Sequence, residues 1–413
     1  MSAYLQLGHD SENLIGVAGL EGFSGLILSP VNRSEVELSK LIPGFRKKAE
    51  YDIVLDPQLY CPRTERGQLP KHRYFPRDID AANVPSPQWW RNLIRQLIAE
   101  AQALEVNVVC SPVILPGKYD PEYYTASIEV FSMLSEELGK TAMRPAQTVC
   151  VALKDLASAD DALRIASIIS SHRPPLCYIV FEANTPPRDE IGEGWTRCPK
   201  CGHWHEVDDP PRPRVVDSTR LSSLMLLISV LEKAGCPTLI SHCSSDMVLM
   251  KAAGASHCAS GKFFNLRRFS RSRFDEPEGA GGGQLPYWFE QGLLAFLRVA
   301  DIARLRRSGF DNFLGVGASS NTFASQILLQ FANEPTKAWL GLSWRQYLAW
   351  FELAERQLSG AEAPSVVSSW LKEAEQRWEQ LDAKDVLLEE RRNDGRWIRP
   401  WRQALGDFRQ FGL

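Results

Sequence analysis

The feature that most constrains the fold is a repeated alternation of short apolar segments with longer amphipathic ones. Seven apolar, β-branched segments are separated by stretches whose apolar residues recur at helical spacing. Short strands that alternate with amphipathic helices form a parallel sheet covered by helices, because a parallel connection needs a long crossover. The expected strands lie at residues 25–31, 51–57, 106–115, 147–153, 176–184, 237–243 and 255–264.

Seven such units exceed a typical doubly wound sheet and approach a (β/α)8 barrel. We therefore expect an α/β fold, a TIM-type barrel over residues 1–283, with a zinc-knuckle insertion at 185–217. A mostly helical, Trp-rich C-terminal region should follow at 284–413. The eighth strand is not evident: residues 292–297 are the candidate, and the first residues could form a hairpin that plugs the bottom of the barrel.

Composition excludes several classes of protein. With 413 residues, 44% of them hydrophobic, the chain can bury a large core. Its net charge of −3 leaves no global basic field, so any nucleic-acid contact must come from a local patch. We expect no membrane helix, because no apolar run approaches about 18 residues. The first residues lack the features of a signal peptide, and four of the nine cysteines, Cys110, Cys150, Cys177 and Cys243, lie in apolar strand-like segments. We therefore expect reduced thiols and a cytoplasmic protein.

One short motif, CPKCGHWH, has the composition of a zinc site. A CPxCG turn brings two thiolates onto one metal ion, and two histidines two residues apart share a face of an extended strand. Four protein ligands leave no open position for a substrate, so we expect Zn²⁺ in a structural role. The alternative is a pair of redox-inert thiols in a loop. The expected ligands are Cys198, Cys201, His203 and His205, with Cys61 or His72 as replacements for one histidine.

Polar residues end several of the expected strands, where barrels place their functional side chains. Asp56 ends the second expected strand, Glu182 lies near the end of the fifth, and His242 lies at the end of the sixth. A buried carboxylate is costly unless it is paired or used. We expect Asp56 and Glu182 to serve as nucleophile and general acid/base, with His242 as a base or orienting donor. The plainer interpretation is helix capping or a salt bridge to a loop arginine.

Two segments that follow expected strands, 55–78 and 262–274, mix cations with aromatic side chains. That mixture suits a polyanion that also offers flat bases. Both loops would open on the same face of the barrel and would form a nucleic-acid surface. The plainer interpretation is a pair of solvated basic loops anchored by their aromatic residues. The predicted nucleic-acid-binding residues are Arg63, Arg66, Lys71, Arg73, Lys262, Arg267, Arg268, Arg271 and Arg273.

A barrel with an inserted zinc motif, strand-end carboxylates and basic mouth loops resembles the tRNA-guanine transglycosylase superfamily, which includes branches that insert deazapurines into DNA. The resemblance spans at most residues 1–300 and is one of architecture. It implies that an aspartate attacks the sugar C1′ and that the base is exchanged; Asp56 and Glu182 are the carboxylates available here. The family's zinc motif lies near the end of the barrel domain, whereas CPKCGHWH lies mid-barrel.

Three functions are consistent with the sequence. The first is an enzyme that modifies or exchanges a base in DNA or tRNA. The second is a non-catalytic subunit of a larger nucleic-acid-handling assembly, in which the Trp-rich C-terminal helices dock a protein partner. The third is a small-molecule lyase or hydrolase on the same barrel, whose arginines bind a phosphate or carboxylate.

Overall fold

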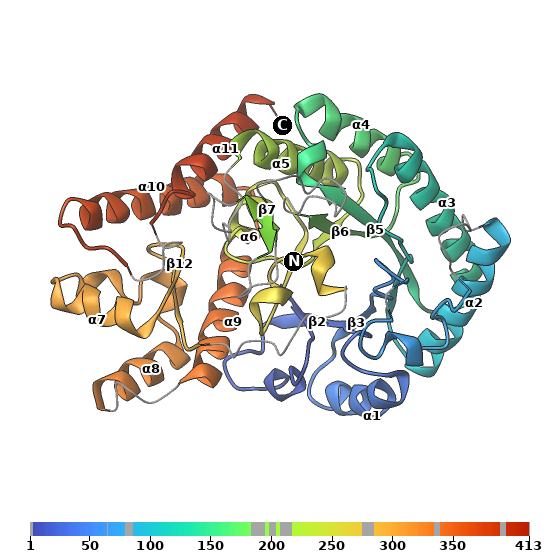
Figure 1. The fold of residues 1–413 in the computed structure, drawn as a ribbon, viewed down its shortest axis with the longest axis horizontal. Helices are drawn as coiled ribbons and strands as arrows, with labels where there is room; N and C mark the ends of the chain where they lie inside the picture. Colours follow the sequence, from blue (N-terminus) through green and yellow to red (C-terminus); the bar gives the residue numbers. More distant parts are fainter. Residues whose placement is uncertain are drawn as a thin grey trace.

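The computed structural model describes residues 3–63, 65–78, 86–182, 195–197, 204–206, 217–274, 285–333, 339–388 and 394–412. Eight strands close into a barrel in which all neighbours are parallel (Figure 1). The expected (β/α)8 architecture is therefore confirmed. The barrel strands are β1 (Ala3–Gln6), β2 (Phe23–Leu28), β3 (Asp52–Leu55), β4 (Val108–Cys110), β5 (Arg144–Ala152), β6 (Cys177–Glu182), β9 (Thr238–Ile240) and β10 (His257–Gly261).

The N-terminal segment closes the barrel, so the expected N-terminal hairpin is wrong. Tyr4 of β1 lies opposite Gly25 of β2 on one side and Ala259 of β10 on the other. All four residues of β1 are buried, and a strand so short shows neither alternation nor a long apolar run. The expected eighth strand is also wrong: β12 (Ala295–Leu297) pairs antiparallel with β11 (Trp288–Glu290) in a separate two-stranded sheet.

Six helices follow barrel strands in turn, and most begin at a polar N-cap. Ser34, Ser86, Asp120, Ser158 and Asp217 each accept a hydrogen bond from a backbone N–H in the first helical turn. The polar caps therefore mark where each crossover turns helical. These helices are α1 (Glu35–Arg46), α2 (Pro87–Ala103), α3 (Pro121–Leu138), α4 (Ala159–Ser170), α5 (Ser218–Lys233) and α6 (Met247–Ala252).

The helix that completes the barrel wall comes from the C-terminal part of the chain. Helix α9 (Leu340–Gln357) packs against β10 and β1, although β11, β12, α7 (Val299–Arg307) and α8 (Thr322–Asn333) intervene in the sequence. A buried ion pair, Lys251 Nζ to Glu355 Oε1 at 3.1 Å, joins α6 to α9. Residues far beyond the last barrel strand thus supply the helix that covers β10 and β1.

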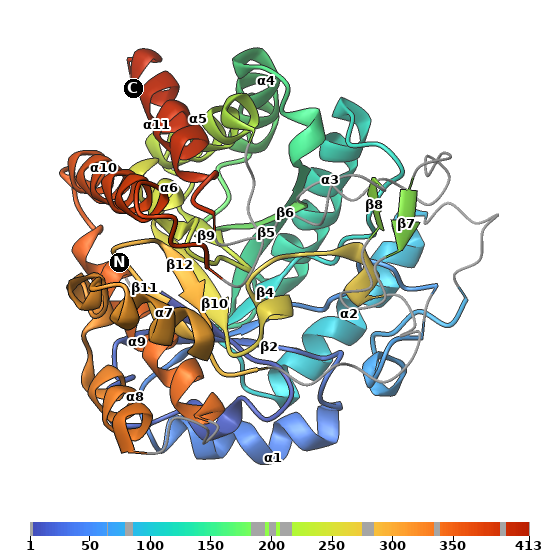
Figure 2. The ribbon, with the colours of Figure 1, turned by 60° about the vertical axis from the view of Figure 1, so that its left-hand side comes forward.

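The last two helices form an outer layer. Helix α11 (Ile398–Gln410) packs against α5, and α10 (Ala363–Asp382) packs against α6 and α11 (Figure 2). Buried Trp378, Trp397 and Trp401 contribute to the core of this layer. In the part of the chain that the structure describes, no helix has the length and apolar character needed to cross a bilayer.

Candidate active site

Asp56 follows β3 directly and lies buried in the barrel mouth, with 1% of its surface exposed. Its Oδ1 accepts the backbone N–H of Gln58 at 3.0 Å. Its Oδ2 accepts the hydroxyls of Tyr60 at 3.0 Å and Tyr178 at 3.2 Å. Burial raises the pKa of Asp56 to about 6, although these hydrogen bonds and the charge of Arg273 oppose the rise. The result is a carboxyl group that can hold or release a proton near neutral pH.

Strand β6 directs a second carboxylate to the same mouth. Side chains alternate along a strand, so Tyr178 and Glu182, four residues apart, share one face. Tyr178 reaches Asp56 across the barrel, which places that face toward the lumen. Glu182 accepts the Tyr119 hydroxyl at 3.1 Å, and Arg271 Nε donates to its two oxygens at 3.0 and 2.9 Å. Glu182 is therefore a paired carboxylate.

His242 follows β9 in a left-handed conformation, with φ of 57°. The Gln6 side chain holds it: Oε1 accepts the His242 backbone N–H at 3.1 Å and Nε2 lies 2.8 Å from His242 Nε2. Arg273 Nη1 also lies 3.0 Å from this nitrogen, and His242 Nδ1 lies 3.1 Å from Ser241 Oγ. Two donors at Nε2 require a neutral ring protonated at Nδ1. Burial and Arg273 lower the pKa of His242 well below its usual value.

The structure places all three predicted catalytic residues at the barrel mouth. Two of them share a neighbouring arginine, whereas the third bonds to other side chains. Arg273 links two of them, since it contacts His242 and its charge lowers the pKa of Asp56. Glu182 has its own partners, Tyr119 and Arg271. Burial raises the pKa of the Cys150 thiol in β5, and both carboxylates add to the rise.

Sequence reasoning did not predict Gln6, Tyr60 and Tyr178 as site residues, and it assigned Arg273, on a loop at the barrel mouth, to nucleic-acid binding. The sequence holds a signal for two of these residues, Tyr178 and Gln6. Tyr178 precedes Glu182 by an even number of residues in one strand, and Gln6 is the polar end of the short apolar segment that begins the chain. Burial lowers the pKa of the Arg273 guanidinium to about 10, although Asp56 opposes that fall.

The loop after β10 packs aromatic rings against two neighbours of the mouth, Tyr60 and His242. Phe269 and Phe274 pack edge-on against Tyr60, with centroids 5.0 and 4.9 Å apart, and Phe269 also contacts the ring of His242 at 5.6 Å. An isolated parallel bridge joins the backbone of Phe269 to Glu182. The loop therefore lies over the mouth, and its aromatic residues anchor it.

Two of the predicted nucleic-acid ligands are buried structural cations. Lys262 Nζ donates to Asp10 O at 3.0 Å and lies 4.1 Å from the centroid of Trp344. Arg267 donates to the carbonyls of Gly261 and Lys262, both at 2.9 Å. It also bonds the Tyr287 hydroxyl and stacks on Tyr347 at 3.6 Å. A polyanion cannot reach these groups without dismantling their contacts.

The remaining predicted cations are divided between internal contacts and the surface. Arg66 Nε donates to Arg273 O at 3.0 Å, and Arg73 forms an exposed ion pair with Glu35. Arg271 bonds to Glu182 and Arg273 bonds to His242, so these two arginines also have partners within the protein. Arg63 and Lys71 are exposed, and Arg268 is half-buried.

The predicted zinc ligands Cys198, Cys201 and His203 lie outside the described residues, and only the backbone of His205 is described. Strand β7 (Trp195–Arg197) precedes the motif, and β8 (Trp204–Glu206), which pairs antiparallel with it, contains the last two residues of the motif. His72 is no substitute ligand, because its Nδ1 lies 2.5 Å from Glu100 Oε1 and its Nε2 2.9 Å from Arg33 O. Among the described residues no group of three or more His, Cys, Asp or Glu could hold a metal ion.

Comparison with known proteins does not place the chain in a family. No family model and no curated protein matches it. The solved structures that it resembles include a mandelate racemase/muconate lactonizing enzyme, with 11% identity, a TM-score of 0.30, and coverage of 64% of this chain and 52% of that one. The match to that enzyme thus spans about half of its length.

Two further solved structures are similarly distant. A 3-hexulose-6-phosphate synthase has 10% identity and a TM-score of 0.30, with 63% of this chain and 90% of that one covered. The (S)-3-O-geranylgeranylglyceryl phosphate synthase of Thermoplasma acidophilum has 11% identity and a TM-score of 0.30, with 65% and 87% covered. At such scores the assignment of the barrel rests on the strand pairing of this chain itself.

Proposed function

We propose that the chain is an enzyme and that Asp56 is its catalytic acid–base group. The observation that carries the proposal is a fully buried strand-end carboxylate whose pKa is raised to about 6. A proton donor or acceptor works best when its pKa lies near the working pH. A buried charged group lowers the stability of a protein. A buried carboxylate at the mouth of a barrel is therefore better explained by a catalytic role than by a packing role.

The neighbours of Asp56 have distinct roles in this proposal. The hydroxyls of Tyr60 and Tyr178 stay protonated, because burial and Asp56 raise their pKa values well above the usual one, and they hold the carboxylate in place. Arg273 supplies a positive charge for negative charge that develops on the substrate. His242, kept neutral, orients Arg273 and can accept a hydrogen bond.

The substrate that fits best is a small polar molecule with a flat ring. The ring of Tyr60, whose hydroxyl bonds the carboxylate, packs against Phe269 and Phe274, and these two rings are at most 2% exposed. A substrate must displace the loop after β10 to reach Asp56. Because most predicted cations already have partners within the protein, proton transfer in a lyase or hydrolase reaction on a small molecule is our first assignment.

Base exchange in DNA or tRNA is the second candidate, and the same aromatic cluster favours it. An extruded base could stack on these rings beside Asp56. In that reaction an Asp56 oxygen bonds to the sugar C1′, the C1′–N bond breaks, and the departing base takes the electron pair and a proton. A nitrogen of the incoming base then bonds to C1′, the C1′–O bond breaks to restore the Asp56 carboxylate, and the incoming base gives up a proton that balances the one taken by the departing base.

A binding panel separates the two assignments. We would measure thermal stabilisation of the wild-type chain by nucleosides, free nucleobases and small carboxylates and phosphates, and gel shifts with tRNA, single-stranded DNA and duplex DNA at several salt concentrations. Small ligands that bind wild type and Asp56→Asn alike, and that only wild type converts, support the first assignment. Steeply salt-dependent binding of a nucleic acid that is weakened by Lys71→Ala supports the second. Turnover by Asp56→Asn at the wild-type rate would exclude Asp56 as the catalytic group in both.

We also propose that the CPKCGHWH motif binds a structural Zn²⁺ ion. The chemistry of its thiols and imidazoles supports this, as does the antiparallel pairing of β7 with β8, which places Arg197 opposite Trp204. The motif follows β6, so the metal would stabilise an insertion on the same side of the barrel as Asp56 and Glu182.

A further inference from the structure

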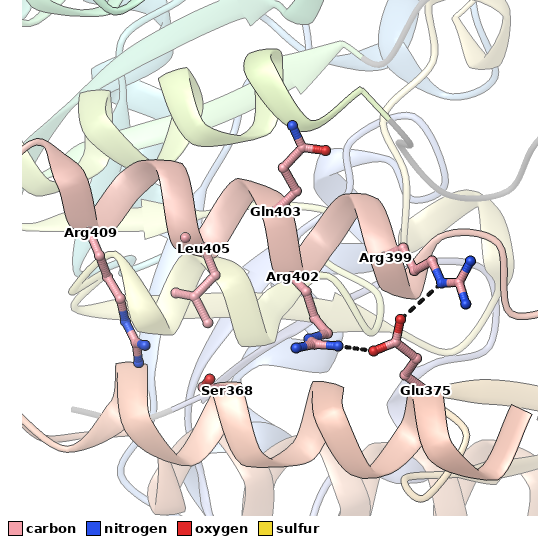
Figure 3. Close-up of a pocket in the computed structure, with 8 residues that line it drawn as sticks. Ser368, Glu375, Arg399, Arg402, Gln403, Leu405 and Arg409 are labelled. Carbon is pink, nitrogen blue, oxygen red and sulfur yellow. Dashed lines mark hydrogen bonds and ion pairs between the residues drawn. The ribbon is translucent and has the colours of Figure 1, made fainter. Parts of the chain in front are cut away.

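Helices α10 and α11 of the outer layer line an open surface cavity of about 380 Å³ (Figure 3). On α11, Arg399, Arg402, Gly406 and Arg409 are spaced by three, four and three residues, so they share the helix face that lines it. Figure 3 shows Arg402 and Arg409 both directed from α11 toward α10, on either side of Leu405. Guanidinium groups therefore bound the cavity at both ends.

The cavity is positively charged and its charges are accessible. Three arginines line it, against the carboxylate of Glu375 in the lining and that of Glu379, which pairs with Arg399 at 3.1 Å. Glu375 accepts Arg399 Nε at 2.9 Å and also pairs with Arg402, and these arginine side chains are 74% and 44% exposed. Exposed ion pairs add little to stability, so the cluster is not explained as a fold-stabilising device.

Arg409 differs from the other two arginines. It donates to Pro364 O at 2.7 Å, and none of the carboxylates in the described ranges forms an ion pair with it. A guanidinium has five N–H donors, so most of its capacity is left for a ligand. Across the cavity, Ser368 offers a hydroxyl from α10.

Gly406 lies in the interior of α11, where glycine is less favourable than alanine. Packing does not require it, because a Cβ atom at this position would meet nothing within 4 Å. The absent side chain leaves the floor of the cavity open between Arg402 and Arg409.

We propose that this cavity binds the phosphate monoester of a small organic molecule. The guanidinium fork matches two phosphate oxygens, and Glu375 holds Arg402 in place beside the site. The volume lies in the range of about 300–1,000 Å³ that is typical of small-molecule sites, which favours a ligand of this size over a long chain. The site is independent of Asp56.

The test uses isothermal titration calorimetry on the full chain with glucose 6-phosphate, inorganic phosphate and glucose. Glucose 6-phosphate should bind, and glucose should not. Arg409→Gln should weaken binding at least about tenfold, since a charge-assisted bidentate contact is lost. Gly406→Glu, which fills the cavity and adds a negative charge, should abolish it. Arg396→Gln, next to α11 and 80% exposed, is the matched control and should bind as wild type does.

Circular dichroism melting verifies that each variant is folded, and Gly406→Ala serves as a variant that should fold at least as well as wild type. Absence of binding by glucose 6-phosphate and inorganic phosphate at millimolar concentrations would overturn the proposal. Binding that persists in both Arg409→Gln and Gly406→Glu would also overturn it. If only an acidic peptide such as oligoglutamate binds, the cavity is a protein-docking site and the phosphate assignment is wrong.

Discussion

Arg273 Nη1 lies 3.0 Å from His242 Nε2, so a guanidinium donates to an imidazole that must be neutral. His242 adopts a φ of 57°, which is uncommon for a residue other than glycine. Because Gln6 bonds both the backbone and the ring of His242, the first strand of the barrel maintains this conformation. The contact couples the loop after β10 to the strand ends on which the proposed chemistry depends.

Asp56→Asn should stabilise the protein at pH 7 while abolishing turnover. The pKa of Asp56 is about 6 in the folded protein against a usual value of 3.8, so the folded state holds the proton more tightly than the unfolded chain. The free energy of unfolding therefore falls as pH rises from about 4 to about 6. Above that window, ionised Asp56 lowers it by the full amount of about 2–3 kcal/mol. We expect the free energy of unfolding, measured in urea at pH 7, to rise by about 1–3 kcal/mol. Tyr60→Phe removes the hydroxyl that donates to Asp56. This variant is the control and should lower the free energy of unfolding.

The same pKa predicts the pH dependence of turnover. If ionised Asp56 is the base, the rate should rise with pH through about 6 and then level off. His242 should not contribute a step there, because its pKa lies well below its usual value. A rate that is flat between pH 5 and 7 would argue against Asp56 as the base.

Arg273→Gln should raise the pKa of two groups at once. The positive charge of Arg273 lowers the pKa of both His242 and Asp56, so its removal shifts both upward. NMR titration of the histidine ring protons follows His242, and the pH profile of turnover follows Asp56. Arg273→Lys keeps the charge and should move either pKa less. Unchanged titration in Arg273→Gln would show that Arg273 does not act on this site.

Arg267→Ala should destabilise the fold and leave nucleic-acid binding by the folded fraction unchanged. It removes the bonds of Arg267 to Gly261, Lys262 and Tyr287 and leaves a cavity against Tyr347, at a cost of about 2–4 kcal/mol. Lys71→Ala, at an exposed position, should change stability by less than about 0.5 kcal/mol. Denaturant melts of both variants provide the measurement. A stable Arg267→Ala protein with weakened DNA or tRNA binding would restore Arg267 as a ligand.

Zinc content should depend on the CPKCGHWH motif. Elemental analysis should find about one Zn²⁺ per purified chain, because four thiol and imidazole ligands complete a tetrahedral site. The double variant Cys198→Ser/Cys201→Ser should lose the metal, and a chelator should lower the melting temperature of wild type alone. Cys61→Ser tests the alternative ligand named above: this variant should keep the metal if His203 and His205 complete the site. Equal zinc in wild type and the double variant would refute the site.

Much of the architecture could be predicted from the sequence because it is encoded locally. Each of the seven expected strands overlaps a barrel strand, and N-caps such as Ser86 and Asp120 mark helix starts. The position of Asp56 at a strand end also follows from local pattern. The N-terminal strand could not be recognised, because four residues are too few to show a period.

The cations of the 262–274 loop show the limit of local reasoning. Sequence could place Lys262, Arg267, Arg271 and Arg273 on the loop over the barrel mouth, but not direct their side chains. Each of these cations bonds to a group outside its own loop; Lys262, for example, bonds to Asp10 and Arg267 bonds to Tyr287. A basic composition therefore did not amount to a basic surface.

By itself the sequence determined the repeating strand–helix units, and with them a parallel barrel whose strand ends carry Asp56, Glu182 and His242. Only the tertiary structure decided which strand closes the barrel, which carboxylate is buried with a raised pKa and which is paired with an arginine. The physical reason is that periodicity and capping act over one turn or one strand. Burial, charge pairing and barrel closure depend on residues up to hundreds of positions apart, such as Gln6 and His242.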